Sequence, residues 1–160
     1  MAKVKTNRST SRLAAVQALY GLALGGKTID EVVKDFMSGA IGAEVIEENE
    51  STGEETFVPV IAAEPGLFSG IMACYADNAE KINDMVNSSF TEDWPKERVE
   101  PTLKAILQAG VAELLAFPDT PSPIVISEYV DITRSFYDGP EVRVVNGILD
   151  RLAKILKDEG

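Results

Sequence analysis

The stretch SPIVISEYVDITRSFYDGPEVRVVNGILDRLAKIL, residues 122–156, decides the fold. Each half of it carries apolar residues three or four positions apart: Val125, Tyr129, Ile132 and Phe136, then Val145, Ile148, Leu149, Leu152 and Leu156. This spacing predicts two helices with one buried stripe each. Ser122 is placed to cap the first helix with Pro123 at its first position, and Pro140 opens the second. We therefore expect an antiparallel helical hairpin on which the rest of the chain packs.

Helical periodicity also covers residues 10–24, 28–37, 65–87 and 101–117. Gly25 and Gly26 end the first of these segments, and Thr28 is placed to cap the second. Sustained period-two alternation is absent from the sequence, so we predict an all-α fold of about six helices. The Glu-rich residues 39–64 lack helical periodicity and predict an acidic loop or insertion. A short hairpin through residues 57–60 is the weaker alternative, because Pro59 would interrupt a strand.

Length and charge limit the class of protein. A chain of 160 residues suits one domain, and it contains no apolar run of the roughly 18 residues that a membrane span requires. We expect a cytoplasmic protein. The net charge is −11, but Lys3, Lys5, Arg8 and Arg12 all precede the first acid, Asp30. Charge is therefore polarised along the chain.

The basic N-terminus is a candidate phosphate-binding site. Residues 1–8 predict a flexible basic arm, and Arg8 and Arg12 lie near a helix start, where free N–H groups also favour anions. From these residues alone, an RNA contact and a solubilising terminus are equally supported. Tyr20 offers a ring for base stacking, although an aromatic residue on such a helix is more often part of the core.

Catalytic and cofactor sites find little support in the sequence. The chain contains no histidine, which excludes the usual general base and imidazole metal sites. Residues 21–28, GLALGGKT, fit the phosphate-loop pattern G-x-x-x-x-G-K-[ST]. That pattern requires a preceding strand, whereas an Ala- and Leu-rich helix is expected here, so a helix stop followed by a Thr cap is the preferred interpretation. We expect no enzyme, no cofactor and no metal.

Two stretches resemble motifs of a known family. Residues 12–20, RLAAVQALY, resemble the A-V-Q-A-L-Y signature of the NusB family of bacterial transcription antitermination factors. Residues 125–128, VISE, and 145–151, VNGILDR, resemble its V-I-N-E and V-N-G-V-L-D motifs. The resemblance covers both ends of the chain and leaves about residues 39–64 unmatched.

The resemblance implies a helical bundle of six to seven helices in two packed halves, and a protein that is not an enzyme. It implies pairing with the ribosomal protein NusE to bind boxA RNA of ribosomal RNA transcripts and, with NusA and NusG, to keep RNA polymerase resistant to termination. The family's RNA contact lies at the N-terminus, which assigns Arg8, Arg12 and Tyr20 to it, while Lys3 and Lys5 are added from their charge. Asn146 and Gly147 are expected to be structural, with the glycine allowing close helix packing.

The sequence also departs from the family pattern. Ser9 and Thr10 stand where arginines are common, Gln108 stands where Arg is frequent, and Ser127 replaces the usual Asn. The thinned arginines keep open a protein-only adaptor of the same fold, or a homodimer that uses exposed apolar residues of the first helix. A nucleotide binder that uses residues 21–28 is the remaining alternative.

Overall fold

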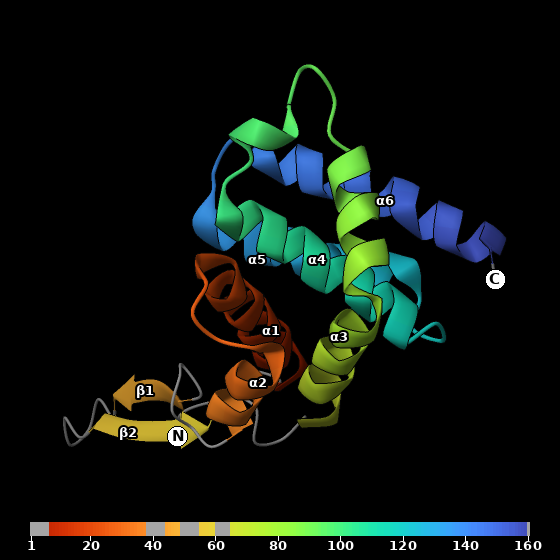
Figure 1. Cartoon of the computed structure of the whole chain (residues 1–160). Coiled ribbons are helices and arrows are strands. Elements are labelled where there is room, and N and C mark those ends of the chain that lie inside the picture. The colour runs from red at the N-terminus through yellow and green to blue at the C-terminus, as the bar shows by residue number, and fades with distance from the viewer. Residues whose placement is uncertain (1–6, 38–43, 49–54, 60–64, 160) are drawn as a thin grey trace. The chain divides into compact units, whose positions relative to one another are not determined.

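The computed structural model describes residues 7–37, 44–48, 55–59 and 65–159. The described helices and strands, in chain order, are α1 (Asn7–Leu24), α2 (Ile29–Met37), β1 (Glu44–Glu48), β2 (Glu55–Pro59), α3 (Pro65–Ser88), the 3-10 turn η1 (Lys96–Arg98), α4 (Pro101–Ala116), α5 (Ser122–Phe136) and α6 (Glu141–Glu159) (Figure 1). The six α-helices confirm the predicted helical class. The chain divides into two compact units, Met1–Ser69 and Gly70–Gly160. One domain over the whole chain stays a prediction.

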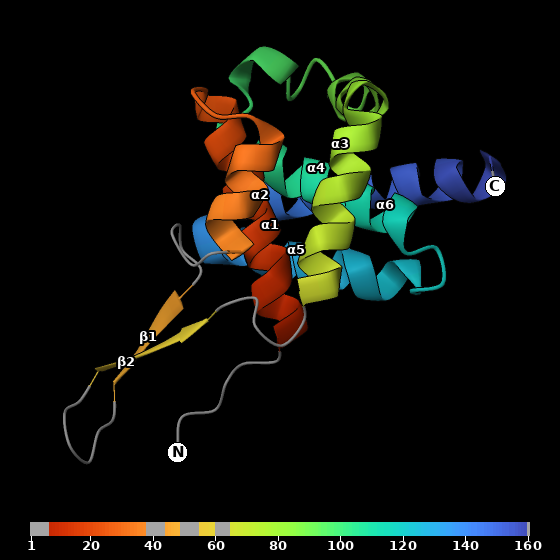
Figure 2. The ribbon, with the colours of Figure 1, turned by 60° about the horizontal axis from the view of Figure 1, so that its bottom comes forward.

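In the N-terminal unit, α1 and α2 pack side by side (Figure 2). Gly25 and Gly26 separate them with φ angles of 86° and 91°, the left-handed conformation that ends a helix at little cost only for glycine. Phe36 of α2 stacks on Phe68, with ring centroids 5.4 Å apart. The expected basic arm at residues 1–8 is wrong at its end, because Asn7 and Arg8 already belong to α1. Apolar periodicity marks where burial begins, and the helix starts one turn earlier.

An antiparallel hairpin interrupts the acidic segment. β1 pairs with β2 in a register that sets Val45 opposite Val58 and Ile46 opposite Phe57. The predicted loop is therefore wrong for residues 44–48 and 55–59. The weaker alternative, a hairpin through residues 57–60, is correct for residues 57–59, whereas strand β1 was not predicted. Pro59 is tolerated because it is the last residue of its strand, opposite Glu44. The rest of the predicted segment, residues 39–43, 49–54 and 60–64, lies outside the described residues.

In the C-terminal unit, α4, α5 and α6 pack on one another (Figure 1). Helix α4 is the most enclosed element, because all its residues from 105 to 113 are buried. Gly110 allows the close approach of α6: a Cβ atom there would lie 3.0 Å from Leu149 Cδ2. The buried members of the predicted stripes in residues 122–156 are Val125, Tyr129, Ile132, Val145, Ile148, Leu149 and Leu152. The predicted core hairpin is thus largely confirmed.

Three residues of that stretch depart from the prediction, and one of them, Leu156, is only partly buried. Ser122 is not the cap of α5 but its first residue, with Pro121 at the cap position and no side-chain cap hydrogen bond. Phe136 is 48% exposed, so its assignment to the core is wrong. It is the last residue of α5, where the helix ends before Tyr137 turns to an extended conformation. Periodicity gives the face of a helix but not how far along its length the neighbouring helix covers that face.

Two hydrogen bonds in this unit pair buried polar side chains across helices. The Tyr129 hydroxyl donates to Glu113 Oε1 at 2.9 Å, and both residues are fully buried. Gln108 Nε2 donates to Asn83 Oδ1 at 2.7 Å, and so links α4 to α3. The departure at Gln108 is therefore structural, since its amide is buried and bonded within the unit.

Helix α3 is kinked at Asn78, whose φ and ψ of −129° and 24° are not helical. The side-chain amide Nδ2 of Asn78 donates to the backbone carbonyl of Cys74 at 2.9 Å. It competes there with the backbone hydrogen bonds of the helix. Cys74 is half-buried rather than a core residue, and burial raises the pKa of its thiol.

The loop after α3 holds the single tryptophan of the chain. Thr91 and Trp94 form an isolated antiparallel bridge. The Nε1 atom of Trp94 is buried and has no hydrogen-bond partner within the described ranges. Arg151 of α6 anchors the start of this loop, because its Nη2 donates to the carbonyl of Ser89 at 2.8 Å.

Within the described ranges, none of the helices combines the length and the apolar character that crossing a membrane requires.

Candidate nucleic-acid interface

The candidate interface is helix α1, which carries no acidic residue over its length Asn7–Leu24. The first N–H groups of a helix lack intrahelical partners, and its dipole is positive at that end. Arg8 lies in this first turn and is exposed. The start of α1 therefore combines an exposed guanidinium with a backbone end that favours anions.

Arg12 does not share the exposure of Arg8, although it follows one helical turn later. It is only 2% exposed, Ser11 beside it is fully buried, and both make interactions within the structure. The sequence grouped Arg8 and Arg12 as one basic cluster, but the structure separates them by environment. The guanidinium of Arg12 belongs to the interior, and only Arg8 presents its charge to solvent.

Tyr20 lies further along α1 and is 37% exposed. Twelve residues separate it from Arg8, which corresponds to about 18 Å along a helix axis. Gln17 is also exposed and precedes Tyr20 by three residues, so that the two side chains lie on one face. Gln17 is not among the site residues predicted from the sequence. Its spacing to Tyr20 was the available signal, since a side-chain amide can bond the edges of bases.

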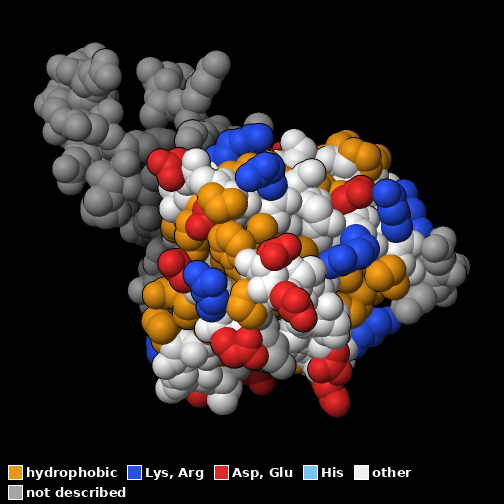
Figure 3. Space-filling model, turned by 90° about the horizontal axis from the view of Figure 1, so that it is seen from above, with side chains coloured by type: hydrophobic (Ala, Val, Ile, Leu, Met, Phe, Trp, Pro, Cys, Tyr) orange, Lys and Arg blue, Asp and Glu red, His pale blue; other side chains and the backbone are white. Residues whose placement is uncertain are grey.

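Lys3 and Lys5, the remaining predicted site residues, lie outside the described residues. Over the part of the chain that is described, Figure 3 shows Lys and Arg side chains interspersed with Asp and Glu on the face it draws. On this face, positive charge is therefore local rather than spread over a broad field. A phosphate-binding surface must then be built from a few exposed cations placed beside neutral hydrogen-bond donors.

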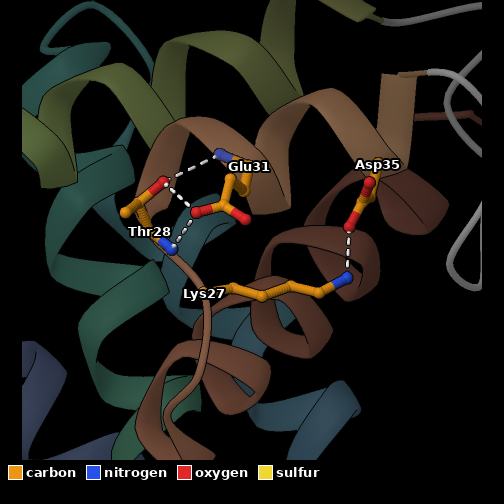
Figure 4. Close-up of polar contacts among 4 residues, drawn as sticks. All are labelled: Lys27, Thr28, Glu31 and Asp35. Carbon is orange, nitrogen blue, oxygen red and sulfur yellow. Dashed lines mark hydrogen bonds and ion pairs between the residues drawn. The ribbon is translucent and has the colours of Figure 1, made fainter.

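The phosphate-loop interpretation of residues 21–28 lacks the structure it requires. Helix α1, not a strand, precedes the glycines. Thr28 and Glu31 form a reciprocal capping box: Glu31 N donates to Thr28 Oγ1 at 3.2 Å, and Thr28 N donates to Glu31 Oε1 at 3.3 Å (Figure 4). Lys27 forms an ion pair with Asp35 one turn further along α2. The Lys and Thr of the pattern therefore start α2, as the helix-stop and cap interpretation predicts.

Among the described residues, no group of three or more His, Cys, Asp or Glu is placed to hold a metal ion.

The model of the NusB family matches residues 9–154. The chain belongs to the NusB family. Relatives include the transcription antitermination protein NusB of Brucella ovis, 38% identical over 157 residues, 98% of this chain and 86% of that protein. The Brucella anthropi protein of the same name is also 38% identical over 157 residues, which cover 98% of this chain and 88% of that protein. Because NusB proteins are antitermination factors, the expectation that this chain is not an enzyme is confirmed.

Solved structures confirm the NusB fold. T. maritima NusB superimposes with a TM-score of 0.62 at 22% identity, covering 94% of this chain and 93% of that chain. A chain of the crystal structure of antitermination factors NusB and NusE in complex with dsRNA gives 0.64 at 20% identity, covering 93% of this chain and 97% of that chain. The prediction of an all-α NusB-like bundle is therefore correct, with the β1–β2 hairpin as an addition to it.

Proposed function

We propose that this NusB family member is an RNA-binding transcription antitermination factor that pairs with the ribosomal protein NusE. The pair binds boxA RNA of ribosomal RNA transcripts in the bacterial cytoplasm. Together with NusA and NusG it suppresses termination by RNA polymerase. The observation that carries the proposal is the 38% identity, over 98% of this chain, to proteins named for transcription antitermination. A complex of NusB, NusE and dsRNA among the structures of the same fold supports the choice of partners.

Helix α1 supplies the RNA contacts in this proposal. Arg8 binds phosphate at the helix start, where the backbone end adds to its charge. Tyr20 stacks on a base and Gln17 bonds a base edge, on the part of α1 that is exposed. Lys3 and Lys5 extend the contact through charge. Arg12 acts from the interior by fixing α1, so that its contribution to RNA binding is indirect.

Fluorescence anisotropy of a labelled boxA RNA tests the proposal. The protein is titrated alone and with its cognate NusE, at two salt concentrations, against a scrambled RNA of equal length. We expect binding that depends on RNA sequence, tightens with NusE and weakens with salt. Equal affinity for the scrambled RNA in both arms would contradict boxA recognition.

Two substitutions separate the roles on α1. Tyr20→Ala should weaken binding by about 1–3 kcal/mol if the ring stacks on a base. Leu24→Ala is the matched control, because Leu24 is 65% exposed on the same helix and offers no aromatic ring. An equal loss in both variants would assign this end of α1 to a protein contact instead.

The protein-only adaptor stays as the second candidate, because specific features favour it. Ser9 and Thr10 thin the basic cluster, Arg12 is buried, and the exposed Leu24 suits an apolar contact. A folded protein that binds NusE but no RNA in any condition would establish this alternative. Light scattering across a concentration series tests the homodimer version.

A further inference from the structure

A groove of about 470 Å³ runs between α5 and α6 in the C-terminal unit. Ser122 at the start of α5 and Lys157 near the end of α6 both line it, as do Arg134 near the end of α5 and Asn146 near the start of α6. The groove therefore follows most of the length of both helices. From Asn146 to Lys157 the groove follows about 16 Å of helix axis, which gives room for more than one phosphate of a nucleic acid.

The lining carries a positive excess on a chain whose net charge is −11. Arg134, Lys154 and Lys157 line the groove with a single acid, Asp150. Arg134 pairs with Asp131 at 2.8 Å and Lys154 with Asp150 at 3.1 Å, but every side chain of these pairs is more than half exposed. Such exposed pairs contribute little stability, so a phosphate can replace the carboxylate at small cost.

Neutral hydrogen-bond donors stand beside these cations. Ser127 and Asn146 are exposed and line the same groove. Buried apolar residues of α5 and α6, Ile126 and Val130 among them, form part of the wall. Cations with hydroxyl and amide donors are the side chains that contact phosphate and sugar in nucleic-acid complexes.

The groove also brings together both C-terminal stretches that resemble family motifs. Ser127 comes from residues 125–128, and Asn146 and Asp150 come from residues 145–151. Neither Asn146 nor Gly147 is buried, and a Cβ atom at Gly147 would meet nothing within 4 Å. The expectation that Gly147 allows close helix packing is therefore wrong. Core packing therefore does not explain the exposed Asn146, which lines the groove.

We propose that the groove between α5 and α6 binds the sugar–phosphate backbone of RNA. This inference rests on the proposed RNA-binding function and adds a second contact surface to helix α1. RNA is favoured over an acidic protein segment because the neutral donors Ser127 and Asn146 are small and are spaced along the groove. Such donors suit repeated contacts to a sugar–phosphate backbone rather than to the edges of bases. The overall negative charge repels RNA from most of the surface, so a local positive groove also directs its path.

The test uses the full chain in the anisotropy assay, with the affinity measured across a salt series. Lys154→Gln with Lys157→Gln removes two exposed groove cations without changing a buried contact. Arg143→Gln with Lys34→Gln is the matched control, since both residues are exposed on helices but do not line the groove. Affinity falls as salt rises, and we expect this dependence to become shallower in the groove variant. The magnitude of the slope of log affinity against log salt should decrease by about 1.4, for two lost phosphate contacts, and should not change in the control. Circular dichroism confirms that both variants fold.

Asn146→Asp gives a second, independent variant. It places a negative charge in the groove with nearly the same side-chain volume, so RNA affinity should fall at low salt more than at high salt. The groove assignment is overturned by an unchanged salt slope in the double lysine variant, or by an equal change in its control. A loss that occurs only when NusE is present would also overturn it, in favour of a protein contact.

These outcomes differ from failure of the proposed function. If the wild-type protein binds no RNA with or without NusE, the function itself fails and the groove inference fails with it. If the wild-type protein binds RNA and the groove variants bind equally well at all salt concentrations, only the groove inference fails.

Discussion

Helices α1 and α6 each carry a stretch that resembles a family motif, but they use these stretches differently. In residues 12–20 of α1, only Gln17 and Tyr20 are exposed, and Leu13 is partly so. In residues 145–151 of α6, Val145, Ile148 and Leu149 are buried while the remaining four residues are exposed. Two stretches that both resemble family motifs therefore differ in how many of their side chains face solvent. The motif of α1 identifies the fold through its interior, and the motif of α6 marks a surface as well.

The largest expected effect is on stability, and it tests whether the α1 motif contributes mainly to the interior. Arg12→Ala should lower the free energy of unfolding by about 3 kcal/mol, because it removes a buried guanidinium that has a partner within the structure. Urea denaturation measures the loss. Arg8→Ala, one turn earlier and exposed, is the control and should change stability by less than about 0.5 kcal/mol. Equal stability of the two variants would remove the distinction between the two arginines.

The next effect tests the two glycines of the C-terminal unit. Gly110→Ala should destabilise the protein by about 1 kcal/mol, because its Cβ would lie 3.0 Å from Leu149 Cδ2 and 3.1 Å from Leu149 Cδ1. Gly147→Ala should instead stabilise it by about 0.5–1 kcal/mol, since alanine is the better helix former and the space is open. Melting temperatures should move in opposite directions. A destabilising Gly147→Ala would show that α6 is covered where the structure leaves it open.

A smaller effect tests the exposed start of α1. Arg8→Gln should reduce the salt slope of RNA binding by about 0.7, the loss of one contact to a single-stranded phosphate. The variant should unfold like the wild type. No change in slope would remove Arg8 from the interface and leave the RNA contacts to Tyr20 and the groove between α5 and α6.

The smallest expected effect is a change in the pH dependence of stability at Tyr137, which lies outside the motifs of α1 and α6. The Tyr137 hydroxyl donates to Glu100 Oε2 at 3.0 Å, and partial burial, followed by this bond, raises the pKa of Tyr137 to about 12. Because the pKa in the folded protein exceeds the ordinary tyrosine value of 10.0, the associated stability is fully present below pH 10 and is lost as pH rises toward 12. Tyr137→Phe should remove this part of the pH dependence. Urea denaturation at several alkaline pH values checks it.

The sequence predicted most of the fold because long, periodic helices carry strong local signals. Thr28 was expected to cap α2 and does so through a hydrogen bond to Glu31 N. The hairpin was missed as the preferred reading because its strands are short, acidic and ended by Pro59. Phe136 was misplaced because its spacing is correct, but α5 ends at that residue. These errors share one cause, since local pattern does not report what lies opposite a residue.

The candidate site was less predictable than the fold. Arg8 and Arg12 have the same charge and lie one turn apart, so that only tertiary structure separates an exposed cation from a buried one. The groove between α5 and α6 joins residues about 20 positions apart in the chain, such as Ser127 and Asn146. No single window of sequence contains both sides. Gln17, by contrast, was available from helical spacing to Tyr20.

The loop that holds Trp94 has a spectroscopic consequence. Trp94 is the single tryptophan of the chain, and it lies in the C-terminal unit with its indole nitrogen buried. Its emission should shift to longer wavelength when that unit opens and water reaches the ring, whereas circular dichroism follows helices of both units. If all 160 residues form the expected single domain, the two signals should change at one denaturant concentration. Separate midpoints would instead give the stability of each unit without any added label.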